Sequence, residues 1–345
     1  MALRNPARGS LTDELRNRRA RGRARQPCRQ GDEVVVVNGG RFGERWIKLA
    51  TAYGVPVHEV RVPWGQAVDP DAVRQALKAN PRSAAVCVQA CESSTGVAHP
   101  VRELAAITAE TEACLIVDAV SALGAMPLPM DAWGVDVLVA ASQKALMLPP
   151  GLGFVTLSEK AWARNKKAKL GKWYFDLGRE LKNQVQNQSA YTPAVSLIEG
   201  LLESLRLMKE EGLANIFARH HRLAEGTRAG VQALGLELFA KVPADSVTSV
   251  LQPASLKPDA VYKGLMQRAN ITIAGGQDAV KGKIFRVAHL GYYDELDILT
   301  VLSAIEIVLR QEGYTSFTPG AGVGAASAIL AAGFVDKAAA AKGAS

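Results

Sequence analysis

The chain of 345 residues is 48% hydrophobic and 21% charged, the composition of an ordinary globular protein long enough for two domains. No stretch approaches twenty uninterrupted apolar residues and the first residues lack the apolar core of a secretion signal, so we expect a cytoplasmic protein without membrane segments. Residues 1–30 hold nine arginines against two acids and supply +7 of the formal net charge of +8. The remainder is nearly neutral, which argues against a nucleic-acid partner.

The four cysteines follow no metal-ligand spacing. Three of them, Cys87, Cys91 and Cys114, lie in segments that we predict to be buried strands, and Cys28 lies in the Arg-rich segment. We therefore expect reduced core residues and no disulfide, zinc or other metal site.

From Gly31 onward, short β-branched strands alternate with amphipathic helices. The stretch GDEVVVV at 31–37 is a turn followed by a buried strand. The elements predicted after it are a helix near 41–53, a strand at 55–62, a helix near 70–79, a strand at 83–90, a helix near 100–111, and strands at 114–120, 135–142 and 153–158. This alternation predicts an α/β fold, with a mainly parallel sheet covered by helices on both faces.

A long amphipathic helix at 195–212 leads into a second unit. The elements predicted there are a helix near 214–234, strands at 246–253, 271–276 and 284–291, and a helix near 294–310. We predict four parts: an Arg-rich segment at 1–30, a large domain at 31–211, a smaller C-terminal α+β domain at 212–331 and an Ala-rich tail at 332–345.

Several polar residues lie at the carboxyl ends of predicted strands, where parallel sheets bind ligands. They are Asp118, residues 142–144 and the loop ACESSTG at 90–96. Lys144 lies in the small, apolar run AASQKALMLPPGLG, where we expect it to be buried. Burial lowers a lysine's pKa, so such a lysine is either ion-paired or a nucleophile.

Taken singly, Asp118 is typical of a turn or helix cap, and Arg286 of an edge-strand arginine that extends into water. Their order along the chain with Lys144 favours pyridoxal phosphate chemistry instead. That cofactor needs a lysine for a Schiff base, a carboxylate that keeps the ring nitrogen protonated, an aromatic ring, phosphate donors and an arginine for the substrate carboxylate.

From about Gly31 to about Leu330 the chain resembles the class V aminotransferases of fold type I, in particular the alanine–glyoxylate and serine–pyruvate branch. The stretches that carry the resemblance are NGGRFGERW, CESSTGVAHP, LIVDAVSALGAMPLPMDAWGVDVLVAASQKALMLPPG, YTPAVSLIEGLLESL and FRVAHLGYYDELD. The resemblance implies a homodimer with shared active sites. It also implies a ping-pong transfer of an amino group from alanine or serine to glyoxylate or pyruvate.

Carried over by position, the resemblance makes Lys144 the Schiff-base lysine, Asp118 the partner of the ring nitrogen and Arg286 the clamp for the substrate carboxylate. The resemblance also places Val120 and Phe42 on the two faces of the cofactor ring and Ser93 near the ring hydroxyl. It makes Gln143 a phosphate ligand, and Thr192 a phosphate contact that each subunit gives to the other. Where the family often has a tyrosine this chain has Ser189, and Tyr191 is the alternative.

The segment before Gly31 departs from the family. The resemblance implies a Gly- and Ser/Thr-rich turn there, opening a helix whose N–H groups bind the phosphate. The run LRNRRARGRARQPCRQ has neither that turn nor an apolar helical face, so the phosphate cradle is unrecognisable. We expect residues 1–30 to be disordered or poorly packed. Three explanations of this departure are open: a genuine basic extension, a frameshifted or wrongly started translation, and a decaying gene. The abrupt lysine-free run favours the frameshift.

Two other functions stay open. A cysteine desulfurase or lyase would need a mobile, reactive cysteine, whereas the cysteines after residue 30 lie in or beside predicted strands. A non-catalytic or cofactor-impaired remnant, or a basic-arm binding protein on the same scaffold, is favoured if the phosphate cradle is lost.

Overall fold

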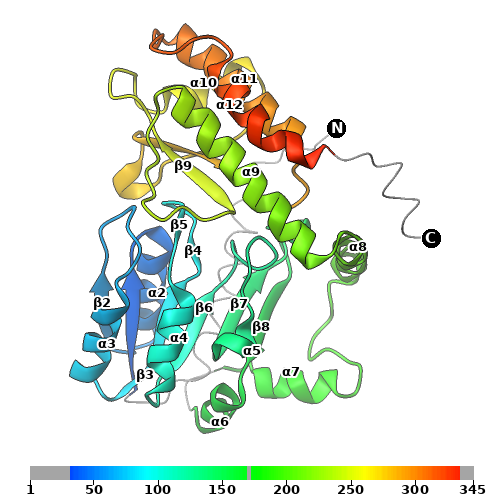
Figure 1. Ribbon diagram of the computed structural model, residues 1–345. Helices are drawn as coiled ribbons and strands as arrows, with labels where there is room; N and C mark the ends of the chain where they lie inside the picture. The colour runs from blue at the N-terminus through cyan, green and yellow to red at the C-terminus, as the bar shows by residue number, and fades with distance from the viewer. Residues whose placement is uncertain (1–31, 169–171, 335–345) are drawn as a thin grey trace. The chain divides into compact units, whose positions relative to one another are not determined.

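The computed structural model describes residues 32–168 and 172–334. The expectations for the Arg-rich segment and for residues 335–345 lie outside this part of the chain. The described residues divide into two compact units: the first runs to Glu92 and again through Ala98–Glu211, and the second comprises Ser93–Val97 and the chain from Gly212 (Figure 1). Gly212 has a φ of 82°, which glycine adopts without strain, and it separates the two long helices at this boundary.

The first unit is built on a six-stranded sheet. Its strands in spatial order are β2 (Val57–Arg61), β1 (Glu33–Asn38), β3 (Ser83–Gln89), β6 (Cys114–Asp118), β7 (Val137–Ala141) and β8 (Gly153–Leu157). All pairings are parallel except that of β8 with β7. The mainly parallel sheet that the alternating pattern predicts is therefore confirmed.

The helices of the first unit are α2 (Arg41–Ala52), α3 (Pro70–Ala79), α4 (Val101–Ala109), α5 (Met130–Trp133), α6 (Glu159–Lys167), α7 (Leu177–Gln184) and α8 (Val195–Glu211). Helices α2, α3, α4 and α6 lie against strands of the sheet (Figure 1). Every residue of β3 is buried, as expected for a strand covered on both faces. The sequence did not predict α5, α6 and α7, because they are short and bury too few apolar residues to show a helical stripe.

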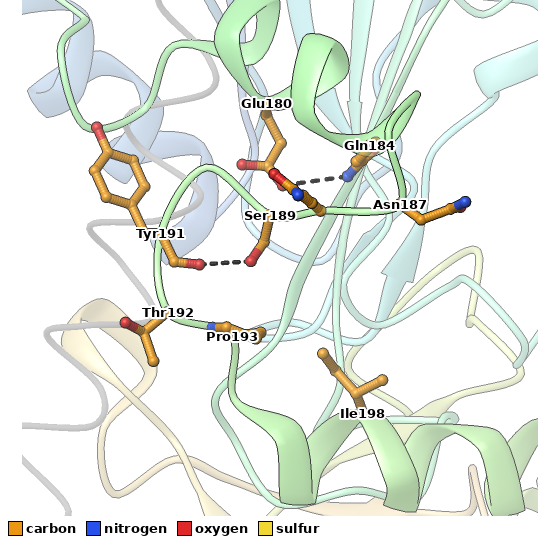
Figure 2. Close-up of a pocket in the computed structure, with 9 residues that line it drawn as sticks. Glu180, Gln184, Asn187, Ser189, Tyr191, Thr192, Pro193 and Ile198 are labelled. Carbon is orange, nitrogen blue, oxygen red and sulfur yellow. Dashed lines mark hydrogen bonds between the residues drawn. The ribbon is translucent and has the colours of Figure 1, made fainter.

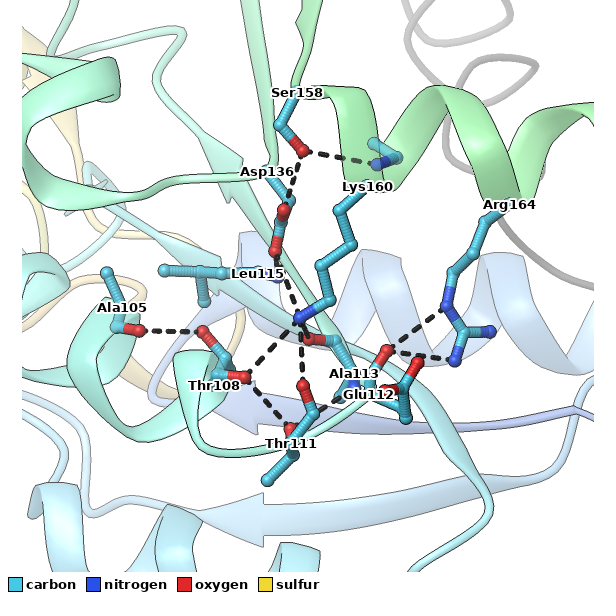
Figure 3. A network of polar contacts seen from close by, with 11 residues as sticks. Ala105, Thr108, Thr111, Glu112, Ala113, Leu115, Asp136, Ser158, Lys160 and Arg164 are labelled. Atoms are coloured by element: carbon cyan, nitrogen blue, oxygen red, sulfur yellow. Dashed lines mark hydrogen bonds and ion pairs between the residues drawn. The ribbon is translucent and has the colours of Figure 1, made fainter.

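A polar network fixes the end at which β6 begins (Figure 3). The Lys160 ammonium donates to the backbone oxygens of Thr108, Thr111 and Ala113, at 3.4, 3.0 and 2.7 Å. It also lies 3.8 Å from the carboxylate of Asp136, which accepts the backbone N–H of Leu115. Lys160 thus binds backbone carbonyls at and after the end of α4. These contacts join α6 to β6, the strand whose other end carries Asp118.

The second unit contains a three-stranded antiparallel sheet. Its strands in spatial order are β10 (Ala274–Gly275), β11 (Ile284–Ala288) and β9 (Val247–Leu251). Its helices are α9 (Leu213–Ala233), α10 (Ala260–Arg268), η1 (Asp278–Val280), α11 (Glu295–Gln311), α12 (Ala321–Leu330) and η2 (Ala331–Gly333). In the first half of the chain, β4 (Cys91–Glu92) and β5 (Val97–Ala98) form a short hairpin where the sequence predicted a loop.

Helix α12 forms from the small residues AGVGAASAIL, which the sequence did not predict as a helix. It packs on α9, where a Cβ added at Gly226 would lie 2.7 Å from the Leu330 side chain. A Cβ at Gly230 would lie 2.5 Å from Leu302 of α11. Close approach between glycine-bearing helices, rather than an apolar stripe, therefore creates this part of the core.

Candidate active site

Four adjacent parallel strands, β1, β3, β6 and β7, end at the same edge of the first unit's sheet. The register pairs Gln89, the last residue of β3, with Asp118, the last residue of β6. Residues 142–144 follow directly after β7. The predicted convergence of Asp118 and Lys144 at one sheet edge is thus present in the structure.

Asp118 is held by contacts from two elements of the first unit. Its Oδ1 accepts the backbone N–H of Val120 at 3.0 Å, which turns the chain sharply after β6. Burial raises the pKa of the Asp118 carboxyl, and the Val120 N–H, a hydrogen bond from Trp46 and the charges of Arg45 and Lys144 oppose that rise. These hydrogen bonds and positive charges favour the ionised form of the Asp118 carboxyl despite its burial. An ionised, desolvated carboxylate is suited to pair with a cationic group of a ligand.

Lys144 is half-buried in a loop that Ser142 closes. The Ser142 hydroxyl donates to the backbone oxygen of Pro149 at 2.8 Å and accepts the N–H of Leu152 at 3.2 Å. Ser142 itself is fully buried. Ser142 was predicted only as part of a strand end, although a serine between two short predicted strands is a sequence signal for such a loop closure.

Two glutamines at this edge have buried amide atoms without a hydrogen-bond partner among the described residues. They are Gln143, through its Oε1, and Gln89, through both Oε1 and Nε2. Gln89 is only 1% exposed, and burying an amide without partners is costly. These atoms mark a place where a bound polar group would supply the missing bonds. Gln89 was not among the residues predicted for the site; its signal in the sequence is a polar residue that closes the largely apolar strand SAAVCVQ.

Phe42 lies in the first turn of α2, half-buried. The Arg45 guanidinium carbon lies 4.8 Å from the centroid of its ring, a cation–π distance. The backbone N–H groups of Phe42 and Gly43 each donate to Oε2 of Glu92, both at 3.0 Å. Glu92 is completely buried. In the sequence it stands out only as part of the loop ACESSTG, with no role of its own.

Arg286 and Ser93 come together in the second unit, although 193 residues separate them. The Arg286 Nη1 donates to the Ser93 backbone oxygen, while Nε and Nη2 donate to that of Gly275, at 3.1 and 2.8 Å. Arg286 is 8% exposed and lies on β11, the central strand of its sheet. The interpretation of Arg286 as an edge-strand arginine extending into water is therefore wrong, because a neighbouring strand covers each side of β11.

Thr192 lies in a different place, on the segment between α7 and α8 (Figure 2). It is exposed and lines an open pocket of about 710 Å³. In the same pocket the Ser189 hydroxyl donates to the backbone oxygen of Tyr191 at 2.6 Å. The Tyr191 hydroxyl donates to the backbone oxygen of Trp173, so in this chain it is engaged away from Thr192.

Comparison with known proteins identifies the family. The model of the family Aminotransferase class-V matches residues 15–314, which includes part of the Arg-rich segment. The chain belongs to the class V aminotransferases. It is 44% identical over 307 residues to a Synechococcus protein named soluble hydrogenase, small subunit, covering 87% of this chain and 79% of that protein.

Two further relatives carry aminotransferase names. The serine–glyoxylate aminotransferase of Methylorubrum extorquens is 36% identical over 313 residues, with 87% of this chain and 78% of that protein covered. The solved structure of alanine–glyoxylate aminotransferase from Nostoc superposes with a TM-score of 0.81 at 30% identity, covering 85% of this chain and 79% of the other. The predicted fold type I architecture and family are confirmed.

Class V aminotransferases are pyridoxal phosphate enzymes, and this class V aminotransferase is one of them. The residues at the sheet edge fit that cofactor on their own chemistry. Asp118 is a desolvated acid beside a half-buried lysine, and Gln89 and Gln143 present amide atoms that lack partners among the described residues. A protonated ring nitrogen would supply the charge opposite to that of the Asp118 carboxylate, and polar groups of the cofactor would supply hydrogen-bond partners for these amides.

Three further observations concern residues 32–168 and 172–334. In these ranges no three or more His, Cys, Asp or Glu side chains are grouped to hold a metal ion. No helix there combines the length and apolar character that crossing a bilayer requires. The thiols of Cys87, Cys91 and Cys114 are buried, and burial raises the pKa of Cys114 to about 12.

Proposed function

We propose that this class V aminotransferase moves the amino group of alanine or serine to glyoxylate or pyruvate in two half-reactions at one site. The observation that carries the proposal is the grouping of Asp118 and Lys144 at one sheet edge, together with the buried guanidinium of Arg286. The named activities of the Nostoc and Methylorubrum relatives support the choice of substrates.

Each site residue has a role in this proposal. The cofactor supplies the electron sink that lets a proton leave the α-carbon of the substrate. Lys144 would hold the cofactor covalently and, when released, move that proton as the base. Asp118 would keep the ring nitrogen protonated. The remaining proposed contacts, to the ring faces, the ring hydroxyl and the phosphate, are Val120, Phe42, Ser93 and Gln143.

The test of the activity is direct. The purified protein should show the absorbance of bound pyridoxal phosphate, and alanine or serine alone should convert it to the amino form of the cofactor. Glyoxylate or pyruvate should then reverse the change. A chain without bound cofactor would favour the cofactor-impaired remnant. The desulfurase or lyase alternative is disfavoured, because Cys87, Cys91 and Cys114 are buried.

Arg286 is the proposed clamp for the substrate carboxylate. In Arg286→Lys we expect the KM for the amino acid and for the oxo acid to rise more than tenfold. An ammonium cannot make the paired hydrogen bonds, and weakening such a buried charge pair costs about 2–5 kcal/mol. Steady-state kinetics with each substrate varied in turn measures the effect, and the cofactor Kd should change little.

The matched control for this variant is Arg228→Lys. Arg228 is also buried in the second unit, where it pairs with Glu225 and Asp245. Its replacement should lower the thermal stability but leave both KM values near those of the wild type. If both KM values were unchanged in Arg286→Lys, Arg286 would be a structural residue.

We also propose a homodimer in the cytoplasm. The segment from Trp173 to Leu205 exposes an unusual number of large apolar side chains: Trp173, Tyr174, Leu181, Val185, Val195, Ile198, Leu202 and Leu205. Such a surface is typical of a protein interface. In this arrangement Thr192 would contact the cofactor phosphate of the partner subunit. The buried thiols suit a reducing compartment.

Leu202, which is 72% exposed on α8, tests the dimer. Leu202→Glu should raise the dimer dissociation constant at least about 100-fold, because a twofold interface places the change in both subunits and each buried leucine contributes about 2 kcal/mol. Sedimentation velocity over a concentration series measures it. Ile307→Glu, at a residue of α11 that is also exposed, at 55%, is the control and should stay dimeric. A Leu202→Glu dimer as tight as the wild type would contradict the proposed interface.

A further inference from the structure

Helix α2 carries residues of the candidate site but has no cap of its own. Its N-cap residue is Gly40, which has no side chain to accept the N–H groups of the first turn. Phe42, Arg45 and Trp46 all lie within its first six residues. The placement of these side chains therefore depends on whatever fixes the start of the helix.

A carboxylate distant in the sequence supplies the missing cap. Oε2 of Glu92, on β4, accepts the N–H groups of both Phe42 and Gly43 at 3.0 Å. A Cβ at Gly43 would lie only 2.7 Å from the backbone oxygen of Val37, so the helix start is pressed against the end of β1. Charged acceptors bind helix N-terminal N–H groups more strongly than neutral ones do, and the helix dipole adds to this.

The same helix surrounds the key acid of the site. Trp46 hydrogen-bonds to Asp118, and the charge of Arg45 lies close enough to act on the pKa of that carboxyl. The Arg45 guanidinium also stacks on the ring of Phe42. A shift or fraying of the first turn would therefore move a ring, a hydrogen-bond donor and a positive charge together.

We propose that Glu92 is a positioning residue of the aminotransferase: its carboxylate anchors the start of α2 and thereby holds Phe42, Arg45 and Trp46 in place around the cofactor ring and Asp118. This inference rests on the roles proposed above for Phe42 and Asp118. Without Glu92, part of the cofactor's binding free energy is consumed in ordering the helix start.

The chain contains a matched control in its second unit. Glu306 is also buried and also caps a helix whose N-cap residue is a glycine, since it accepts the N–H groups of Gly320, Gly322 and Val323 at the start of α12. Helix α12 contains none of the proposed site residues. Replacing Glu306 therefore measures the general effect of losing a buried helix cap, and replacing Glu92 measures that effect together with any effect on the site.

The experiment compares Glu92→Ala, Glu92→Gln and Glu306→Ala in the full chain. Three properties are measured: the Kd of pyridoxal phosphate for the apoprotein, the pH midpoint of the bound cofactor's absorbance, and the thermal midpoint. We expect Glu92→Ala to raise the Kd about tenfold and to shift the pH midpoint, with partial recovery in Glu92→Gln, which keeps a neutral acceptor. Glu306→Ala should lower the thermal midpoint while the Kd stays within about twofold.

Equal Kd values and equal pH midpoints in Glu92→Ala, Glu306→Ala and the wild type would overturn the inference, and Glu92 would be a structural cap alone. If Glu92→Ala does not fold, Glu92→Gln decides: an unchanged Kd and pH midpoint overturn the inference, and a shift in both supports it. If the wild-type chain binds pyridoxal phosphate and transaminates, and these variants behave in the same way, the inference about Glu92 fails but the proposed function stands. A wild-type chain that binds no cofactor overturns both.

Discussion

Lys144→Ala is expected to abolish transamination, with a fall in rate of at least about 10⁴-fold, and to remove the absorbance of the covalently held cofactor. The variant loses both the nucleophile that holds the cofactor and the base that moves the α-proton. Single-turnover measurements with alanine and with serine give the rate, and spectra of the purified variant report the attachment.

The control for this variant is Lys160→Ala. Lys160 is likewise a partly buried lysine of the first unit, but its ammonium binds backbone carbonyls at and after the end of α4 (Figure 3). Its loss should lower the thermal midpoint, since those carbonyls and Asp136 lose their partner, while the folded variant keeps its turnover at low temperature. Turnover above background in Lys144→Ala would refute the assignment of the catalytic lysine.

Asp118→Asn should retain weak cofactor binding but lose about 10²–10⁴-fold in turnover. An asparagine oxygen can still accept the N–H of Val120, so the turn after β6 is preserved. A neutral amide cannot keep the ring nitrogen protonated, however, and the electron sink is weakened. Measurements of kcat and of the cofactor Kd check the two parts separately. The expected signature is a loss in kcat that exceeds the loss in affinity.

Asp136→Asn provides the comparison for that result. Asp136 is a buried acid of the same sheet that accepts the N–H of Leu115 and the hydroxyl of Ser158, at the opposite end of β6. Its replacement should destabilise the fold without changing the kcat of the folded fraction. Turnover near that of the wild type in Asp118→Asn would mean that Asp118 acts only as a turn residue.

Much of the first unit follows from local pattern. Four consecutive buried valines predict β1, and the apolar periodicity of 70–79 predicts α3, because burial on two faces or on one stripe is visible within ten residues. Helix α6 was not predicted because it has no apolar stripe. A capping serine and the contacts of Lys160 stabilise it instead. Helix α12 escaped because its small residues pack only where α9 offers glycines.

The sequence by itself determined the strand–helix alternation and the order of Asp118, Lys144 and Arg286, since a residue's type and its place at a strand end are local properties. Only the tertiary structure decided what these residues touch. Glu92 caps a helix that begins about fifty positions earlier, and Arg286 reaches the Ser93 carbonyl across 193 positions. Such contacts depend on strand register and on which strand is central. These are set by the packing of the whole sheet, which no short window of sequence contains.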